Sequence, residues 1–94
     1  MDPITLIGSA AAVCSTVSFL PQAWKIIRSG RTDDISAPTY ALTVTAFALW
    51  AVYGVLRDDW PLIATNTISG ALSAFILAMT LMPALARRIA SGRR

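Results

Sequence analysis

Trp50 and Asn66 are two side chains with hydrogen-bonding groups inside stretches of the chain that hold no charged residue. Trp50 lies seven residues before Arg57, which is about 10 Å along a helix, and Asn66 lies about 8–9 Å inside the next stretch. An asparagine amide in hydrocarbon must find hydrogen-bond partners or line a wet cavity. Each residue could also serve helix packing, since polar side chains often bond between helices. Their matched depth favours a pair that binds a solute.

Further side chains share a helical face with these two residues. Counting back from Arg57 by three or four residues gives Tyr53, Trp50 and Ala46. One face therefore carries a charge at its outer end, then a phenol and an indole. On the following stretch, polar and small residues share a face with Asn66: Ser69, Gly70 and Ser73.

Pro21 and Gln22 lie near the end of the first uncharged stretch. A proline inside a helix removes the hydrogen bond to the carbonyl of Val17 and crowds that turn. The result is a kink or a hinge, which is tolerated where neighbouring groups or water satisfy the freed carbonyl. Gln22 offers both donors and an acceptor beside it. A passive kink is the alternative.

The composition argues against several kinds of chemistry. The chain has no histidine and no glutamate, and its one cysteine, Cys14, lies in an uncharged stretch. The sequence therefore predicts no metal site, no Ser–His–acid set, no cofactor and no enzymatic activity. It also predicts no amphipathic surface helix. Because no acid or histidine lies inside an uncharged stretch, we expect no proton coupling, and a solute would move down its gradient.

The charged residues are confined to the ends of three long stretches, 3–24, 35–56 and 60–86. About 20 apolar residues cross a bilayer, and a charge in hydrocarbon is costly, so each stretch predicts a membrane-spanning helix. Charged residues make up 14% of the chain, against about 25% in soluble domains. We expect one domain, 1–94, with these parts: helices at about 4–27, 38–56 and 61–84, a loop at about 28–37, a tight loop at 57–60 and a tail at 85–94.

The distribution of basic residues predicts an orientation. Segment 25–31 holds three of the eight basic residues and the tail 87–94 holds four, and two crossings place both on one side. Cytoplasmic flanks are enriched in lysine and arginine. We expect a multi-pass protein of the cell inner (plasma) membrane, with the N-terminus outside and the C-terminus cytoplasmic. The net charge of +3 does not indicate nucleic acid, because the basic residues lie at membrane edges.

An ordered set of motifs resembles the PQ-loop superfamily and, more narrowly, SemiSWEET, the bacterial half-sized relatives of the SWEET sugar transporters. The resemblance covers about residues 4–86 of the chain. A lone Pro-Gln would be a weak signal, whereas the whole set in this order is specific. The motifs are Phe19-Leu20-Pro21-Gln22, Lys25-Ile26-Ile27-Arg28, Asp34-Ile35-Ser36, Leu49-Trp50-Ala51-Val52-Tyr53-Gly54 and Asn66.

The resemblance implies a fold and a binding site. The fold is a triple-helix bundle with the third helix between the first and the second, and two bundles form a parallel homodimer around a central path. Trp50 and Asn66 of both copies line the sugar site, and Ala46 flanks it. An indole face suits the C–H face of a pyranose, and the amide suits its hydroxyls.

The resemblance also implies the moving parts. Pro21 and Gln22 act as the hinge for alternating access between the two sides of the membrane. An outer gate closes across the dimer axis by hydrogen bonds and ion pairs of Tyr53, Arg57 and Asp59.

The function expected from this resemblance is uniport of a mono- or disaccharide by a homodimer. Two alternatives remain open from the sequence. The first is a PQ-loop carrier of an amino acid or another small metabolite. The second is a structural or regulatory membrane subunit without transport activity.

Overall fold

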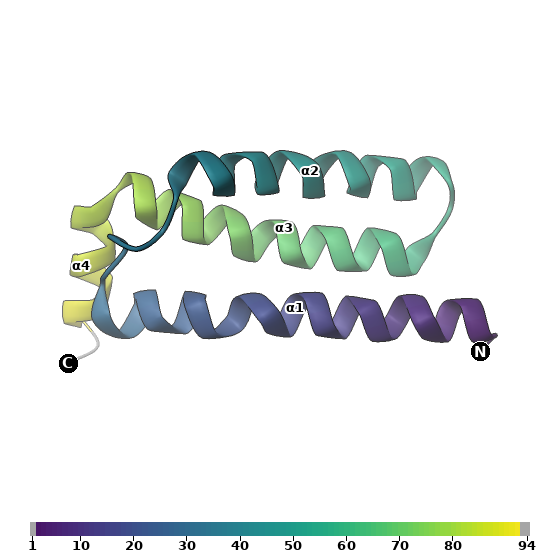
Figure 1. Cartoon of the computed structure of the whole chain (residues 1–94), viewed down its shortest axis with the longest axis horizontal. Coiled ribbons are helices and arrows are strands. Elements are labelled where there is room, and N and C mark those ends of the chain that lie inside the picture. Colours follow the sequence, from purple (N-terminus) through teal and green to yellow (C-terminus); the bar gives the residue numbers. More distant parts are fainter. Residues whose placement is uncertain (1, 93–94) are drawn as a thin grey trace.

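The computed structural model describes residues 2–92. They form four helices joined by short turns and loops (Figure 1). The first three are long and apolar enough to cross a membrane, and no strand occurs in residues 2–92. This confirms the all-α membrane fold with three spans. Arg93 and Arg94, which the orientation argument counts, lie outside the described residues. The helices are α1 (Pro3–Ser29), α2 (Ala37–Leu56), α3 (Trp60–Leu81) and α4 (Pro83–Gly92).

The three long helices begin in the same way. A side-chain oxygen accepts a hydrogen bond from the backbone N–H three residues on, and a proline follows where an N–H would have no helical partner. The prolines are Pro3, Pro38 and Pro61. Local sequence alone therefore decides where each span starts. The capping pairs are Asp2 with Thr5 at 2.8 Å, Ser36 with Thr39 at 3.3 Å and Asp59 with Leu62 at 3.2 Å.

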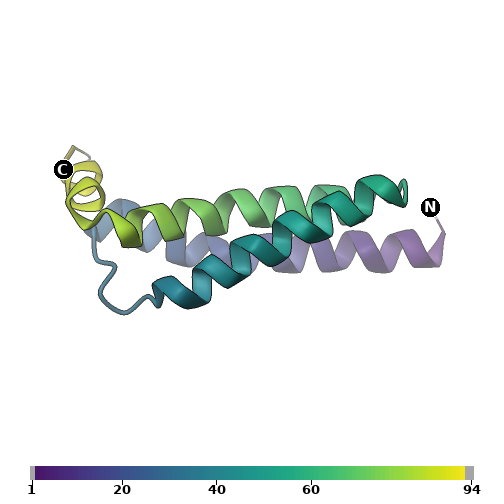
Figure 2. The same cartoon turned by 90° about the horizontal axis from the view of Figure 1, so that it is seen from above.

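The helix α3 packs between α1 and α2, which confirms the order that the resemblance implies (Figures 1 and 2). Among the described residues, no Cα atoms of α1 and α2 approach within 8 Å. Their side chains do meet, because the ring of Phe19 lies 5.6 Å from that of Phe47 and 6.5 Å from that of Tyr40, centroid to centroid. The helices α2 and α3 pack tightly at Gly54, where an added Cβ would lie 3.1 Å from the backbone nitrogen of Ile63.

The buried face of α3 changes character along its length. Near the middle it carries Asn66, Ser69 and Ser73, and toward α4 it carries Ile76 and Met79. The apolar part joins buried residues from other segments, so the hydrophobic core sits at the end of the bundle where α4 lies. Those residues are Ala23, Ile26, Ile35 and Ala86.

The end of α3 differs from the expected one. The sequence predicts a third helix to about residue 84 and a tail at 85–94, whereas α3 ends at Leu81. Pro83 causes the break, because a proline has no N–H to donate to the preceding turn. The same residue then begins α4, where the missing N–H has no consequence.

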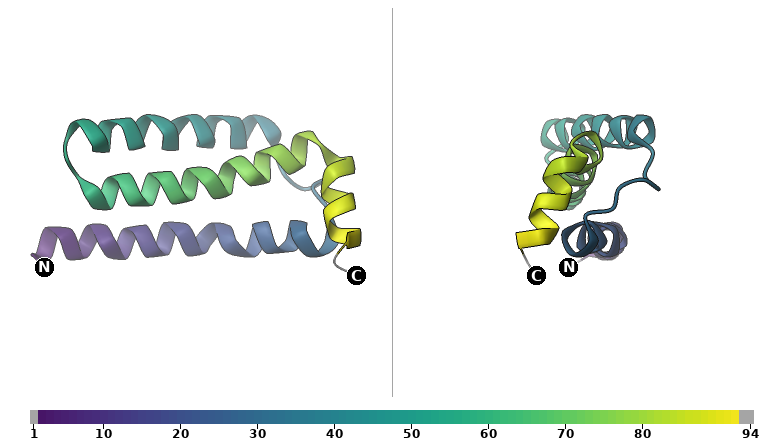
Figure 3. Two further views of the ribbon diagram at one scale, coloured as in Figure 1. Left: turned by 180° about the vertical axis from the view of Figure 1, so that it is seen from behind. Right: turned by 90° about the vertical axis from the view of Figure 1, so that its left-hand side faces the viewer.

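The helix α4 also corrects the expectation that the chain has no amphipathic surface helix. It crosses the end of the bundle beside the end of α1 (Figure 3). Its apolar face buries Ala86 and Ala90, while Arg87 and Arg88 remain exposed. The expectation was wrong because apolar residues recur at helical spacing within the basic tail. Those residues are Leu85, Ala86, Ile89 and Ala90.

The loop between α1 and α2 depends on Gly30. This residue ends α1 in the left-handed conformation, with φ +69°, and its N–H donates to the carbonyl of Ile26 at 2.8 Å. A Cβ on Gly30 would lie 2.9 Å from the Cα of Arg87, so the absence of a side chain also lets α4 lie against this turn. Backbone geometry and packing both require glycine here.

We expect Gly30→Ala to lower the free energy of unfolding by about 1–2 kcal/mol or more, because alanine is strained in the left-handed region and its Cβ would meet α4. Thermal unfolding of the purified protein in detergent, followed by circular dichroism, measures this. Gly92→Ala is the matched control, since no atom lies within 4 Å of its added Cβ. Equal unfolding of the two variants would contradict this account of the turn.

Candidate solute-binding site

An open hollow of about 500 Å³ lies against one flank of α2 and is lined by Ala46, Leu49, Trp50 and Tyr53. Trp50 is 52% exposed there, which is unusual for an indole near the middle of a span. Its ring meets the ring of Tyr53 edge to face, with centroids 5.5 Å apart. The structure thus brings together three of the residues predicted for the site and gate: Ala46, Trp50 and Tyr53.

The packing of α2 on α3 explains why this flank is open. Phe47 and Gly54, seven residues apart, share the face of α2 that contacts α3. A Cβ on Gly70 of α3 would lie 3.3 Å from the Cβ of Phe47. Trp50 lies between these two contacts along the helix but to one side of them, and the hollow that it lines includes no residue of α3. The hollow therefore has one wall within this chain.

Asn66 occupies a different environment. It is 7% exposed on the buried face of α3, and its Nδ2 donates to the carbonyl of Leu62 at 2.7 Å. It is not among the residues that line the hollow over Trp50. On the same face, Ser73 donates to the carbonyl of Gly70 at 3.1 Å, whereas the fully buried hydroxyl of Ser69 has no partner in the described residues. Such a group is costly in a protein interior.

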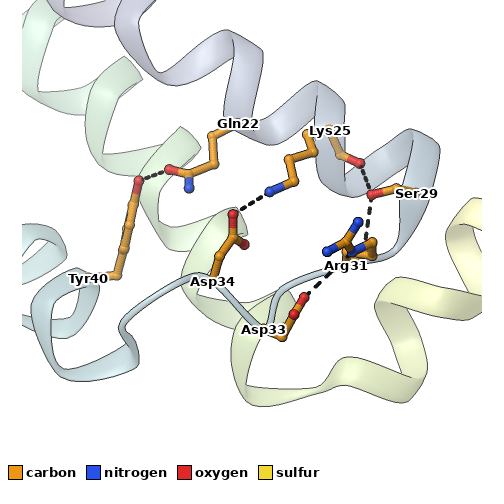
Figure 4. A network of polar contacts seen from close by, with 7 residues as sticks. All are labelled: Gln22, Lys25, Ser29, Arg31, Asp33, Asp34 and Tyr40. Carbon is orange, nitrogen blue, oxygen red and sulfur yellow. Dashed lines mark hydrogen bonds and ion pairs between the residues drawn. The ribbon is translucent and has the colours of Figure 1, made fainter.

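At the predicted hinge, α1 continues without interruption through Pro21 (Figure 1). The side chain of Gln22 accepts a hydrogen bond from the hydroxyl of Tyr40, which joins α1 to the first turn of α2 (Figure 4). Sequence reasoning did not assign Tyr40 this role. The two residues are eighteen positions apart, and only the path of the intervening loop decides that they meet.

At the opposite end, the three predicted gate residues do not form an ion pair within one chain. Both ion pairs found in residues 2–92 lie at the α4 end of the bundle, and neither includes Arg57 or Asp59. Asp59 instead caps α3, because its Oδ1 accepts from the backbone N–H of Leu62 at 3.2 Å. The side chains of Tyr53, Arg57 and Asp59 are all exposed.

A polar network ties the loop between α1 and α2 to α1 (Figure 4). Lys25 forms an ion pair and hydrogen bond with Asp34, and the backbone carbonyl of Lys25 accepts from the hydroxyl of Ser29 at 2.6 Å. The hydrogen bond from Lys25 holds the pKa of the Asp34 carboxyl below its ordinary value of 3.8. The loop that leads into α2 is therefore held to α1 by the contact at Asp34, in addition to its covalent connections to the two helices.

Three helices that could span a membrane, with an open hollow on one flank, define the class of protein as a small helical membrane protein. Residues 4–63 match the PQ loop repeat family. The chain is 45% identical over 83 residues to the sugar transporter SemiSWEET of Bradyrhizobium diazoefficiens, covering 86% of this chain and 96% of that protein. The chain therefore belongs to the SemiSWEET family of PQ-loop proteins, which confirms the resemblance found in the sequence.

Two further relatives agree. The sugar transporter SemiSWEET of Leptospira biflexa is 44% identical over 64 residues, covering 68% of this chain and 75% of that protein. A crystal structure of SemiSWEET in the inward-open conformation superposes with a TM-score of 0.79 at 33% identity, covering 98% of this chain and 99% of that one. Both the sequence and the whole backbone thus follow a family of transporters, not of enzymes.

The Lys25–Asp34 contact makes stability depend on pH in a defined direction. Because the pKa of Asp34 is lower in the folded protein than its ordinary value of 3.8, the contact stabilises fully above that value. The stabilisation is lost as the pH falls through the lowered pKa of the folded state. We expect the wild type to be more stable than Asp34→Asn at neutral pH, and this difference in stability to shrink as the pH is lowered from neutral to well below 3.8.

Thermal unfolding of both proteins across this range measures the difference. Asp33→Asn is the control, because its contact with Arg31 is 3.7 Å long and the carboxylate side chain is 75% exposed. A stability difference between wild type and Asp34→Asn that did not change with pH would contradict the assignment.

Proposed function

We propose that this protein is a sugar uniporter, which moves a mono- or disaccharide down its gradient as a parallel homodimer. The single observation that carries this proposal is the hollow over Trp50, which has one wall in this chain and is open on the other side. Three helices cannot enclose a polar path away from lipid, whereas two copies facing each other can. The names of the relatives, which are sugar transporters, support the choice of solute.

The proposed site consists of Trp50, Asn66 and Ala46. The half-exposed indole of Trp50 offers a flat face for the C–H face of a sugar ring. The amide of Asn66 can exchange its bond with the Leu62 carbonyl for bonds to sugar hydroxyls. Ala46 lies one turn from Trp50 in the same hollow, and its small side chain leaves room for the solute.

The proposed conformational change uses both ends of α1 and α2. Pro21 and Gln22 act as the hinge. Pro21 leaves one carbonyl of α1 without its helical hydrogen bond, and the next residue, Gln22, bonds through its side chain to Tyr40 of α2. Exchange of this bond would accompany opening of the inner end. At the outer end, the exposed side chains of Tyr53, Arg57 and Asp59 close across the dimer axis.

Uniport and orientation follow from the placement of charged residues. The three spans contain no aspartate, glutamate or histidine, so none supplies an intramembrane group that could carry a proton with the sugar. Among residues 2–92, five basic residues lie at the α4 end of the bundle and only Arg57 lies at the other end, so we place the α4 end in the cytoplasm and the N-terminus outside the inner membrane. The five are Lys25, Arg28, Arg31, Arg87 and Arg88.

We expect Trp50→Ala and Asn66→Ala each to lower the rate of sugar uptake into proteoliposomes by about tenfold or more, because each removes contacts to the sugar worth at least one hydrogen bond. Uptake of radiolabelled glucose and sucrose, normalised to the amount of reconstituted protein, measures this. Trp60→Ala is the matched control, since Trp60 is an exposed tryptophan outside the hollow. Normal uptake by both site variants would overturn the site, and uptake driven by an imposed proton gradient would overturn uniport.

The dimer predicts which surface of one chain meets the other. In a Cys14→Ala background, we expect Leu49→Cys to form cross-linked dimers in membranes, because Leu49 is 67% exposed and lines the hollow. Ile68→Cys is the control. It is 48% exposed but lines a different hollow, which is formed by residues of α1 and α3 and none of α2. Equal cross-linking at both positions, or an active protein that is strictly monomeric, would contradict the dimer.

A further inference from the structure

A second recess lies at the α4 end of the bundle, far along the helices from the proposed sugar site. It has a volume of about 390 Å³ and is lined by residues from the end of α1, the loop after it, the end of α3 and the start of α4. Figure 3 shows how these segments come together at that end of the bundle. This volume falls within the range of about 300–1,000 Å³ that is typical of small-ligand pockets. The residues of its lining that matter here are Arg31, Thr32, Asp33, Thr80, Pro83 and Arg87.

The lining carries more positive than negative charge. Arg31 and Arg87 face one carboxylate, that of Asp33. The contact between the Nε of Arg31 and the Oδ1 of Asp33 is 3.7 Å long and both side chains are well exposed, so the guanidinium keeps donors for another acceptor. Arg87 forms no ion pair within residues 2–92. A guanidinium presents its N–H groups in a planar fork that matches phosphate oxygens.

Thr32 is the second, independent sign of a ligand. It lines the recess with only 8% of its surface exposed, and its hydroxyl makes no hydrogen bond within the described residues. The hydroxyl oxygen itself is not among the fully buried, unpartnered side-chain atoms of the described residues, so a ligand in the recess can reach it. A phosphate oxygen in the recess would supply the missing acceptor.

The start of α4 contributes to the same recess. Pro83 is the first residue of α4 and lies in the lining, so the positive end of the helix dipole is directed at this space. Thr80, which also lines the recess, donates its hydroxyl proton to the carbonyl of Ile76 at 2.7 Å and adds no negative charge to this edge. The recess also lies at the ends of two membrane spans, which is the depth at which lipid headgroups lie.

We propose that this recess binds a phosphate group at the membrane surface, held by Arg31, Arg87 and Thr32 at the start of α4. The phosphate can come from the headgroup of an anionic phospholipid or from a free solute, and the chemistry of recognition is the same. The site is separate from Trp50 and Asn66, and it does not depend on the transported solute. It gives α4, which the sugar path does not use, a role in binding at the membrane interface.

The test uses the full chain in a neutral detergent and follows its thermal unfolding with three probes. These are short-chain phosphatidylglycerol, short-chain phosphatidylcholine as the zwitterionic match, and sodium phosphate against sodium chloride of equal ionic strength. A ligand that binds only the folded protein raises the melting temperature. We expect phosphatidylglycerol to raise it and phosphatidylcholine not to, and the double variant Arg31→Gln/Arg87→Gln to weaken the apparent affinity by about tenfold or more.

Arg88→Gln is the matched control, because Arg88 is the neighbouring exposed arginine of α4 and does not line the recess. Thr32→Val keeps the side-chain shape and removes only the hydroxyl, so it provides the reading if the double variant fails to fold. A rise with sodium phosphate alone would support the site with a free phosphate as its ligand. No rise with any probe, an equal rise with both lipids, or a rise that Thr32→Val and the double variant leave unchanged would overturn the proposal.

Discussion

Hydrocarbon tolerates neither an unpaired charge nor an unpaired backbone group, and the whole molecule is arranged around that constraint. It confines the charged residues to the helix ends and forces the spans to be helical. It also requires every polar side chain inside a span to find a hydrogen-bond partner in a neighbouring backbone group, in a partner helix or in an aqueous path. Asn66 bonds back to its own helix at Leu62, while the hydroxyl of Ser69 is buried without a partner. Both lie on the face of α3 that runs between the other two helices.

The central position of α3 links this constraint to transport. Close approach at Gly54 holds α2 against α3 and turns Trp50 and Tyr53 to one side. The hydrophobic core lies at the α4 end, so the middle of the bundle and the end opposite α4 are held by fewer buried apolar side chains. A bundle that is firmly packed at one end and thinly packed elsewhere can change its helix spacing at low cost, as alternating access requires.

The α4 end of the bundle combines firm packing with polar contacts that can exchange. The bond between Gln22 and Tyr40 and the ion pair of Lys25 with Asp34 join α1 to the following loop and helix, and both lie next to Pro21. At the same end, α4 packs against the turn at Gly30. Binding of a phosphate between Arg31 and Arg87 would therefore act on the loop that follows the proposed hinge.

Much of this protein follows from its sequence alone. The three spans, their capped starts and the family are readable because charge exclusion and the capping residues act over a few neighbouring positions. Tertiary structure decided the rest. It placed Trp50 in an open hollow and Asn66 in a buried face outside it, although both have the same depth along their helices. It joined Tyr40 to Gln22 and folded the basic tail into α4. Depth depends on position along one helix, whereas contact depends on the rotation of two helices about their axes, and only packing sets that rotation.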